Sequence, residues 1–359
     1  MPLRALIPVV WGSPECRRAL KRRCEKCASG ASAPLLFRII VGYFAAGTAT
    51  PRAFFGARSP VACWFSSWKL RATRQSTLAL TAALSDKAKL RYNPRMVDLR
   101  YLFRLDGRVA FIAGAASGIG LAAAQGLAAA GAFTICTDIN GPGAERAAAA
   151  IQEQGGQAEA LALDITDAAA VANAFMRLAD KHQRIHIAIS TPAVNIRRRL
   201  LDYTDADFQK VLGLNLGGSF NVLRAAGRHM AANGGGSIIL FSSMRAVTVE
   251  PGQSVYATTK AGLIQMARGL AVELGPAGVR VNCIAPGVVE TPLTAPIKEK
   301  PEWYQAYSSR NALNRWAKAE EMAGPVVFLA SDASSYVTGT VLFADGGWTA
   351  IDGRFAPPL

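Results

Sequence analysis

Short apolar runs recur at regular intervals along residues 96–359. Each run is as long as a strand and is hydrophobic along its whole length, as expected of strands that are covered on both faces. Such runs are typical of a parallel sheet buried between two layers of helices. The pattern predicts strands at Val109–Ala113, Phe133–Thr137, Ala158–Leu163, Ile185–Ser190, Ser237–Phe241, Arg280–Ala285 and Thr340–Ala344.

Alanine-rich stretches of helical length lie between these runs. We expect Thr166 and Asp205 to cap helices, and Gly131 and Gly275 to end them. Regular alternation of strand and helix predicts an α/β fold, namely a Rossmann-type doubly wound parallel sheet of about seven strands with helices on both faces. The predicted helices are Ile119–Ala130, Gly143–Gln154, Ala168–Lys181, Asp205–Ala232, Ser254–Leu274 and Glu320–Ser331.

The first part of the chain lacks this alternation and carries most of the charge. Residues 1–98 hold 17 Lys/Arg against 4 Asp/Glu, whereas the rest of the chain holds 23 against 21, so the net charge of +15 is not a property of the folded body. We expect residues 1–95 to be a basic leader that is disordered, or that results from a gene start placed upstream of Met96. A transit peptide is the alternative, because the leader is basic and poor in acids. Residues 96–359 are expected to form a single domain, with no nucleic-acid or membrane partner.

Cysteine usage bears on the cellular compartment. Cys136 and Cys283 are the body's two cysteines, and each lies in an apolar run. Two such thiols favour a reducing, cytoplasmic location over a disulfide framework. Cys24 and Cys27 form a CxxC pair with no second pair or histidine pair after it, so we expect no metal.

A glycine-rich turn joins the first predicted strand to the first predicted helix. Its residues Gly114, Ser117, Gly118, Ile119 and Gly120 follow the spacing Gly-x-x-x-Gly-x-Gly. Glycines at this junction let the backbone approach a pyrophosphate, and the helix N-terminus offers N–H groups to the phosphates. The turn therefore predicts a dinucleotide site.

Acidic residues follow the next two strands. Asp138 lies 18 residues after Gly120, near the separation expected of the acid that accepts hydrogen bonds from the adenosine ribose. Because a carboxylate there repels a 2′-phosphate, and no Lys or Arg follows in Ile139 or Asn140, we expect NAD rather than NADP. Asp164 and Ile165, which follow the next strand, are further candidate cofactor-binding residues, and Asp164 is placed to meet the adenine.

Three polar side chains predict proton chemistry. Tyr256 and Lys260 are four residues apart on a predicted helix and so share one face. A nearby ammonium favours the phenolate, which could then act as a general base. Ser243, thirteen residues before Tyr256, follows a strand at the carboxyl edge of the sheet, where a hydroxyl can bond a carbonyl oxygen that gains charge. Asn215 lies in an otherwise apolar helical stretch, where it is either functional or a satisfied buried amide.

These motifs resemble those of the short-chain dehydrogenase/reductase family, over residues 104–350. The resemblance implies that Asn215, Ser243, Tyr256 and Lys260 are the catalytic four. Tyr256 would be the acid/base, Lys260 would lower its pKa and bind the nicotinamide ribose, Ser243 would orient the substrate, and Asn215 would hold a water. It also implies that the turn after the sixth strand binds the nicotinamide amide, through Pro286, Gly287, Val289 and Thr291.

Two segments depart from the family pattern. Ala113 stands where a Thr is usual before the first glycine, and Ser190–Ala193 replaces the usual Asn-Asn-Ala-Gly. Pro192 also removes a backbone N–H. We expect altered cofactor affinity, with the catalytic four intact.

Arginines near the predicted site bear on the substrate. Arg245 lies two residues after Ser243, and further arginines include Arg197, Arg198 and Arg199. Guanidinium groups bind carboxylates in a bidentate manner, so an anionic substrate is one interpretation and solvated loop arginines are the other. The variable segment 291–309 could form a lid.

The C-terminal motifs at Leu313–Trp316 and Asp345–Trp348 resemble those of sugar, polyol and sugar-acid dehydrogenases, and they also occur widely among 3-oxoacyl reductases. We therefore expect an NAD-dependent oxidoreductase acting on a secondary alcohol of a sugar, polyol or hydroxy acid. One alternative keeps the hydride transfer but changes the substrate, and is a 3-oxoacyl-thioester reductase. The other alternative is a regulatory protein that binds the cofactor without catalysis. The resemblance implies a homotetramer, assembled through helices 205–232 and 254–274 and through the C-terminal segment 343–359.

Overall fold

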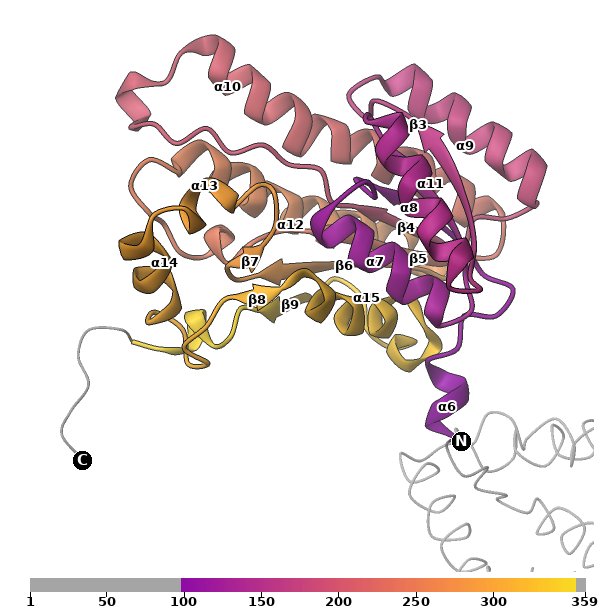
Figure 1. The fold of residues 1–359 in the computed structure, drawn as a ribbon. Coiled ribbons are helices and arrows are strands. Elements are labelled where there is room, and N and C mark those ends of the chain that lie inside the picture. Colours follow the sequence, from indigo (N-terminus) through magenta and orange to yellow (C-terminus); the bar gives the residue numbers. More distant parts are fainter. Residues whose placement is uncertain (1–97, 353–359) are drawn as a thin grey trace, which may run out of the picture. The chain divides into compact units, whose positions relative to one another are not determined.

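The computed structural model describes residues 98–352 (Figure 1). The predicted leader at residues 1–95, the Cys24/Cys27 pair and the last seven residues of the chain lie outside the described part. In the described residues no helix is long and apolar enough to cross a membrane.

A seven-stranded sheet in the order β3-β2-β1-β4-β5-β6-β9 forms the centre of the fold, and each strand pairs in parallel with its neighbours. The predicted Rossmann-type sheet is therefore confirmed. β1 and β4 are buried along their whole length, which is why their sequences do not alternate. The strands are β1 (Val109–Ala113), β2 (Phe133–Asp138), β3 (Gln157–Ala162), β4 (Ile187–Ser190), β5 (Gly236–Phe241), β6 (Val279–Pro286) and β9 (Val341–Ala344).

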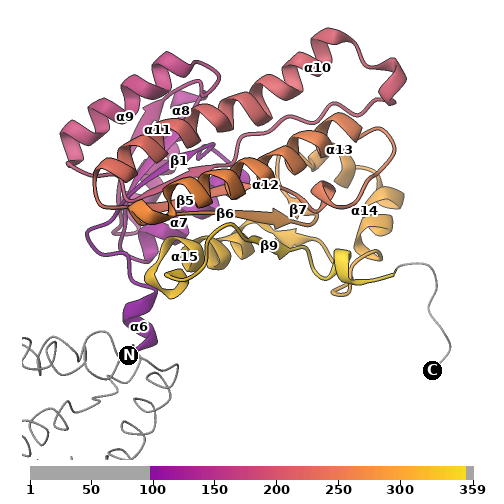
Figure 2. The same cartoon turned by 180° about the vertical axis from the view of Figure 1, so that it is seen from behind.

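Helices cover both faces of the sheet (Figures 1 and 2). On β1 the side chain of Phe111 belongs to the core on one face, and those of Ala110 and Ile112 belong to the core on the other. Phe111 meets Phe175 of α9 with ring centroids 4.7 Å apart. One layer contains α7 (Gly118–Ala129), α8 (Gly141–Glu153) and α15 (Ala323–Ala330), and the other contains α9 (Ala168–His182), α11 (Ser219–Ala232) and α12 (Ser254–Leu274).

The long helix predicted at 205–232 is interrupted. It comprises α10 (Asp205–Leu212), a π-helical turn at Gly213–Gly218 and α11. Two glycines follow Asn215 in this turn, and such π turns are frequent at functional sites. The turn places Asn215 in a local geometry that the apolar spacing did not predict.

Both predicted helix caps were wrong. Thr204, not Asp205, caps α10 by accepting a hydrogen bond from the N–H of Asp207. Asp167, not Thr166, caps α9 by accepting from two N–H groups of its first turn. In each case the capping residue has extended backbone just before the first turn, so its side-chain oxygen reaches the free N–H groups.

Short elements beyond the carboxyl ends of the strands were not predicted. A two-stranded sheet pairs β7 (Val289–Glu290) with β8 (Ala317–Lys318). α13 (Ala295–Lys298) and α14 (Pro301–Ser308) lie within the variable segment 291–309. A further unpredicted element lies before the first strand, where a four-residue helix, α6 (Leu99–Leu102), precedes β1.

Candidate active site

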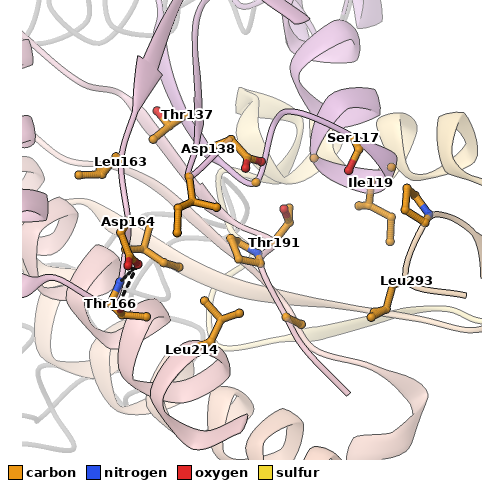
Figure 3. A pocket seen from close by; sticks show the side chains of 18 of the residues that line it. Ser117, Ile119, Thr137, Asp138, Leu163, Asp164, Thr166, Thr191, Leu214 and Leu293 are labelled. Carbon is orange, nitrogen blue, oxygen red and sulfur yellow. Dashed lines mark hydrogen bonds between the residues drawn. The ribbon is translucent and has the colours of Figure 1, made fainter. Parts of the chain in front are cut away.

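A cavity of about 640 Å³ opens at the carboxyl ends of β1 and β4, where the strand order changes direction (Figure 3). Nine of the residues predicted to bind the cofactor line it. Pro286 and Val289 lie at the end of β6 and in β7, Lys260 lies on α12, and none of the three lines this cavity. The nine lining residues are Gly114, Ser117, Gly118, Ile119, Gly120, Asp138, Asp164, Ile165 and Thr291.

The glycine turn fits a dinucleotide because its backbone leaves no room for side chains. Gly114 has a φ of +86°, and a Cβ on Gly120 would lie 1.9 Å from the carbonyl oxygen of Gly114. Ser117 is the N-cap residue of α7, yet its side chain makes no capping hydrogen bond. The first-turn N–H groups of α7 are thus left without a side-chain cap, as a phosphate-binding helix N-terminus requires.

Thr191, in the segment that departs from the family pattern, braces this turn. Its hydroxyl donates a 2.8 Å hydrogen bond to the carbonyl oxygen of Ala113, where the family usually has a Thr of its own. A Cβ on Gly114 would lie 2.2 Å from the Thr191 hydroxyl oxygen. The two departures are therefore in direct contact, and Thr191, Pro192 and Ala193 of the second departure line this cavity.

Asp138 ends β2 with its carboxylate held beside the glycine turn. Oδ2 accepts a hydrogen bond from the N–H of Ala116 (3.1 Å), and Oδ1 accepts from that of Asn140 (2.9 Å). Asp164, on the other side of the cavity, accepts from the N–H and hydroxyl of Thr166, as the dashed lines in Figure 3 show. Lys210 of α10 also lines the cavity and was not predicted, because no pattern in the sequence around it relates it to the glycine turn.

A second cavity of about 500 Å³ contains the predicted substrate residues Ser243, Arg245 and Tyr256. Gly287 lines it as well, and Leu293 lines both cavities. The glycine-turn cavity and the cavity that contains Ser243 and Tyr256 therefore adjoin across the turn that follows β6. A ligand that extends through the first cavity past Leu293 would reach Tyr256.

Tyr256 lines the second cavity together with Ser243 and Arg245. Burial raises the pKa of Tyr256, whereas the hydrogen bond with Ser243 and the charges of Arg245 and Arg197 lower it. Ser243 is 8% exposed and also accepts a hydrogen bond from the N–H of Arg245. Burial has the largest effect, so the pKa of Tyr256 lies above its usual value, and these contacts offset only part of the cost of forming a buried phenolate.

Lys260 lies one helical turn from Tyr256. Its Nζ is 5.6 Å from the centroid of the Tyr256 ring and donates a 2.8 Å hydrogen bond to the carbonyl oxygen of Phe241. Burial lowers the pKa of Lys260 to about 8. The ammonium thus faces the tyrosine ring from a buried position at the carboxyl end of β5.

Asn215 is fully buried, and its amide is engaged on both sides. Oδ1 accepts from the N–H of Val194 (2.8 Å), and Nδ2 donates to the carbonyl oxygen of Val194 (2.9 Å). Nδ2 also donates to the hydroxyl of Thr259 (3.2 Å), which itself donates to the carbonyl oxygen of Tyr256. Asn215 therefore ties the segment after β4 to the catalytic helix.

Glu250 does not line the second cavity, but it contacts two arginines that do, and sequence reasoning missed it. It pairs with Arg197 and Arg245, two of the arginines noted in the sequence. An acid five residues after Arg245 was the available signal, but only the fold brings Arg197 to it. Among the described residues, no cluster of His, Cys, Asp or Glu could hold a metal ion.

Comparisons with known proteins agree with this geometry. The family model described as "Enoyl-(Acyl carrier protein) reductase" matches residues 114–349. The chain is 38% identical over 256 residues to galactitol 2-dehydrogenase (L-tagatose-forming) of Cereibacter sphaeroides, which covers 70% of this chain and 99% of that enzyme. It is 36% identical over 244 residues to the 3-oxoacyl-[acyl-carrier-protein] reductase of Thermotoga maritima, which covers 68% of this chain and 98% of the relative.

A solved structure is similar over the same region. A putative NAD(P)-dependent gluconate 5-dehydrogenase from Beutenbergia cavernae, with bound NADP at low occupancy, matches with a TM-score of 0.68 and 37% identity. The match covers 70% of this chain and all of that one. The glycine turn, the Ser243–Tyr256–Lys260 arrangement and these relatives agree, and the chain belongs to the short-chain dehydrogenase/reductase family.

Proposed function

We propose that this protein transfers a hydride between NAD(H) and a secondary alcohol or ketone, with a sugar, polyol or hydroxy acid as substrate. The observation that carries the proposal is the Ser243–Tyr256 hydroxyl pair, in a cavity that adjoins the glycine-turn cavity at Leu293. The oxidoreductase class follows from family membership, whereas the cofactor preference and the substrate class are proposals.

The nicotinamide ring, when bound, accepts or supplies the hydride. In alcohol oxidation Tyr256, as phenolate, takes the proton of the substrate hydroxyl, and in ketone reduction it returns one. The Ser243 hydroxyl donates a hydrogen bond to the substrate oxygen, where negative charge develops during the reaction. Lys260 favours the phenolate through its charge, and Asn215 holds the segment after β4 against the catalytic helix.

The cofactor we propose is NAD. Asp138 has its carboxylate fixed by two backbone N–H groups at the end of β2, where it would accept hydrogen bonds from a ribose and repel a 2′-phosphate. Two considerations favour NADP instead. Lys210 lines the same cavity, and several similar solved structures contain NADP, including a gluconate 5-dehydrogenase from Burkholderia cenocepacia in complex with NADP and tartrate. The choice between the two is therefore the first question for assay.

The substrate class is proposed from the cavity and from the relatives. The second cavity presents amide, hydroxyl and guanidinium groups, which suit a polyhydroxylated molecule. Similar curated proteins include D-threitol dehydrogenase of Mycolicibacterium smegmatis and gluconate 5-dehydrogenase of Gluconobacter oxydans. Reduction of 3-oxoacyl thioesters is the second candidate, favoured by the similarity to the Thermotoga maritima enzyme.

A spectrophotometric screen tests the proposal. The purified chain is given NAD⁺ or NADP⁺ with galactitol, threitol, gluconate and a 3-hydroxyacyl thioester, and nicotinamide reduction is followed. We expect turnover of a polyol or hydroxy acid with NAD⁺, abolished in Tyr256→Phe. Turnover of the thioester alone would select the second candidate. Cofactor binding without turnover of any class would indicate a non-catalytic protein.

Two further properties are part of the proposal. The thiols of Cys136 and Cys283 are both free and buried, which suits a reducing, cytoplasmic compartment. A homotetramer is proposed because α11 and α12 present exposed apolar side chains, among them Phe220 (45% exposed) and Val272 (81% exposed). Native mass spectrometry would give the subunit number directly.

A further inference from the structure

Glu250 gathers donors from three distant parts of the chain. Its Oε1 accepts from Arg197 Nη1 at 2.7 Å, and its Oε2 accepts from Arg245 Nη2 and, at 2.8 Å, from Gln253 Nε2. The hydroxyl of Tyr307, on α14, lies 2.7 Å from Oε1 and 2.6 Å from Oε2. One carboxylate thus organises the polar wall of the cavity that contains Tyr256.

This wall has one more positive charge than negative. Arg197 and Arg245 both line the cavity, and Glu250 is the single carboxylate that pairs with them. The side chain of Arg245 is only 7% exposed and that of Arg197 is 28% exposed, so water screens the surplus charge poorly. Lys300 and Glu299 at the same cavity balance each other, so the surplus remains.

Both guanidiniums retain hydrogen-bond donors. In the part of the chain that the structure describes, the Arg245 side chain makes one hydrogen bond, through Nη2, and Arg197 uses one bond each from Nη1 and Nη2. A guanidinium carries five N–H groups, so each arginine has at least three left over. These donors fit a carboxylate, which accepts two parallel bonds from a guanidinium.

Aromatic rings hold the two guanidiniums in place. The Arg245 guanidinium carbon is 5.3 Å from the centroid of the Trp348 ring and 5.9 Å from that of Tyr307. The Arg197 guanidinium carbon is 5.5 Å from the centroid of Trp303. Rings at these distances favour the cation and restrict its rotation, so the free donors are oriented before a ligand arrives.

A neutral acceptor lies beside this charged wall. Asn195 lines the cavity and donates through Nδ2 to Gln253 Oε1 at 2.9 Å. Its Oδ1 is buried and has no hydrogen-bond partner among the described residues. A buried amide oxygen without a partner is costly, and a substrate hydroxyl would satisfy it.

We propose that Arg197 and Arg245, organised by Glu250, bind the carboxylate of the substrate, which is therefore a hydroxy acid anion rather than a neutral polyol. The inference rests on the proposed function and narrows its substrate class. One carboxylate neutralises the surplus charge, and hydroxyl groups along the same molecule reach Asn195 and the Ser243–Tyr256 pair. Glu250 and the aromatic rings act as positioning residues.

Tartrate and threitol are matched probes for this inference, because they share a four-carbon diol and differ in having carboxylates or hydroxymethyl groups at the ends. Calorimetric titration of the NADH-loaded full chain measures both affinities without turnover. We expect tartrate to bind at least about tenfold more tightly than threitol, which corresponds to about 1.4 kcal/mol. Arg245→Ala and Arg197→Ala should each remove most of that preference, because tartrate affinity should fall much more than threitol affinity.

Arg199→Ala is the control, because Arg199 is exposed on the same loop and does not line the cavity. It should alter neither affinity. If Arg245→Ala fails to fold, Arg245→Gln takes its place: it keeps a hydrogen-bond donor toward Glu250 and removes the positive charge, so the preference for tartrate should fall in the same way. Equal affinity for tartrate and threitol, or a preference for tartrate that survives both arginine variants, would overturn the inference.

The same samples separate this inference from the proposed function. Turnover of polyols by a protein without preference for tartrate would refute the carboxylate subsite and leave the proposed dehydrogenase intact. Preference for tartrate in a protein that oxidises no secondary alcohol would refute the dehydrogenase and leave the anion site. Both results come from binding and rate measurements on one preparation.

Discussion

The two adjoining cavities differ in whether backbone or side chains form most of their walls. The cofactor cavity is walled by the backbone of a glycine turn and by the carboxyl ends of successive strands, with a few fixed acids. The substrate cavity is walled by long side chains from the segments after β4, β5 and β6. The first depends on the absence of side chains, whereas the second depends on which side chains are present.

This difference has a consequence for how function diverges. A change in the glycine turn alters the path of the backbone next to β1, so it affects the cofactor and the fold together. A change at Glu250 or Arg197 alters charge at the edge of the molecule and leaves the sheet unaffected. A family with this design can therefore keep one cofactor site and vary its substrates, because substrate selectivity resides in loops beyond the strand ends.

The largest expected effect is on the substrate side. Tyr256→Phe removes the hydroxyl that transfers the proton, and general acid–base groups contribute about 10²–10⁴-fold to rate. We expect turnover to fall within that range while NADH affinity, measured by fluorescence titration, is unchanged. Full activity in this variant would show that another group transfers the proton.

The counterpart on the cofactor side is Gly120→Ala. Its Cβ would lie 1.9 Å from the carbonyl oxygen of Gly114, so the turn must shift. We expect NADH affinity to fall at least tenfold and the free energy of unfolding to fall by about 1–3 kcal/mol, as for overpacked sites. Gly269→Ala, on α12 where an added Cβ has no neighbour within 4 Å, is the matched control and should raise stability by about 0.5–1 kcal/mol.

Cofactor choice should respond to one charge. Asp138→Asn removes the carboxylate proposed to repel a 2′-phosphate, so the ratio of kcat/KM for NADP⁺ to that for NAD⁺ should rise by about tenfold. Steady-state kinetics with both cofactors measure it. Asp167→Asn, at the cap of α9 outside the cavity, should leave the ratio alone. An unchanged ratio in Asp138→Asn would show that another residue discriminates between NAD⁺ and NADP⁺. Lys210, which lines the same cavity, would be the next residue to test.

The pH dependence of kcat/KM should follow the pKa of Tyr256 in the substrate cavity. Oxidation needs the phenolate, and burial raises the pKa of Tyr256, so kcat/KM should increase with pH above neutrality. Because the Ser243 hydrogen bond lowers that pKa, Ser243→Ala should move the rise to higher pH as well as slow the reaction. A slower variant with an unmoved profile would mean that Ser243 acts on the substrate alone.

The smallest effect is expected at the opposite edge of the sheet, away from both cavities. His186 accepts a hydrogen bond from the N–H of Val109 through Nδ1, and burial, with the charges of Arg184, Arg108 and His229, lowers its pKa from 6.5 to about 4. The unfolded chain therefore binds more protons between these values, and stability should decline as pH falls from about 6.5 to about 4. Thermal melts across this range measure the decline, which should be shallower in His186→Gln because glutamine offers a neutral acceptor.

The sequence by itself determined the sheet, the glycine turn and the spacing of the Ser243 and Tyr256 hydroxyls, whose catalytic role is still a prediction. Apolar runs with no alternation identify strands that are buried on both faces, and a strand followed by Gly-x-x-x-Gly-x-Gly identifies the turn, since both are local patterns. For the same reason nine predicted cofactor residues do line one cavity. The predicted caps were one residue off, because neighbouring polar residues compete for the capping position.

Only the tertiary structure decided which residues from distant segments of the chain come into contact. It broke the predicted 205–232 helix at a π turn, brought Lys210 to the cofactor cavity and placed Arg197, Glu250 and Tyr307 in contact. These three residues are separated by 53 and 57 positions along the chain, and no local pattern relates them. Charge pairing across such distances depends on where loops end after folding, which is why the glycine-turn cavity could be predicted from the sequence, whereas the pairing of Arg197, Glu250 and Tyr307 could not.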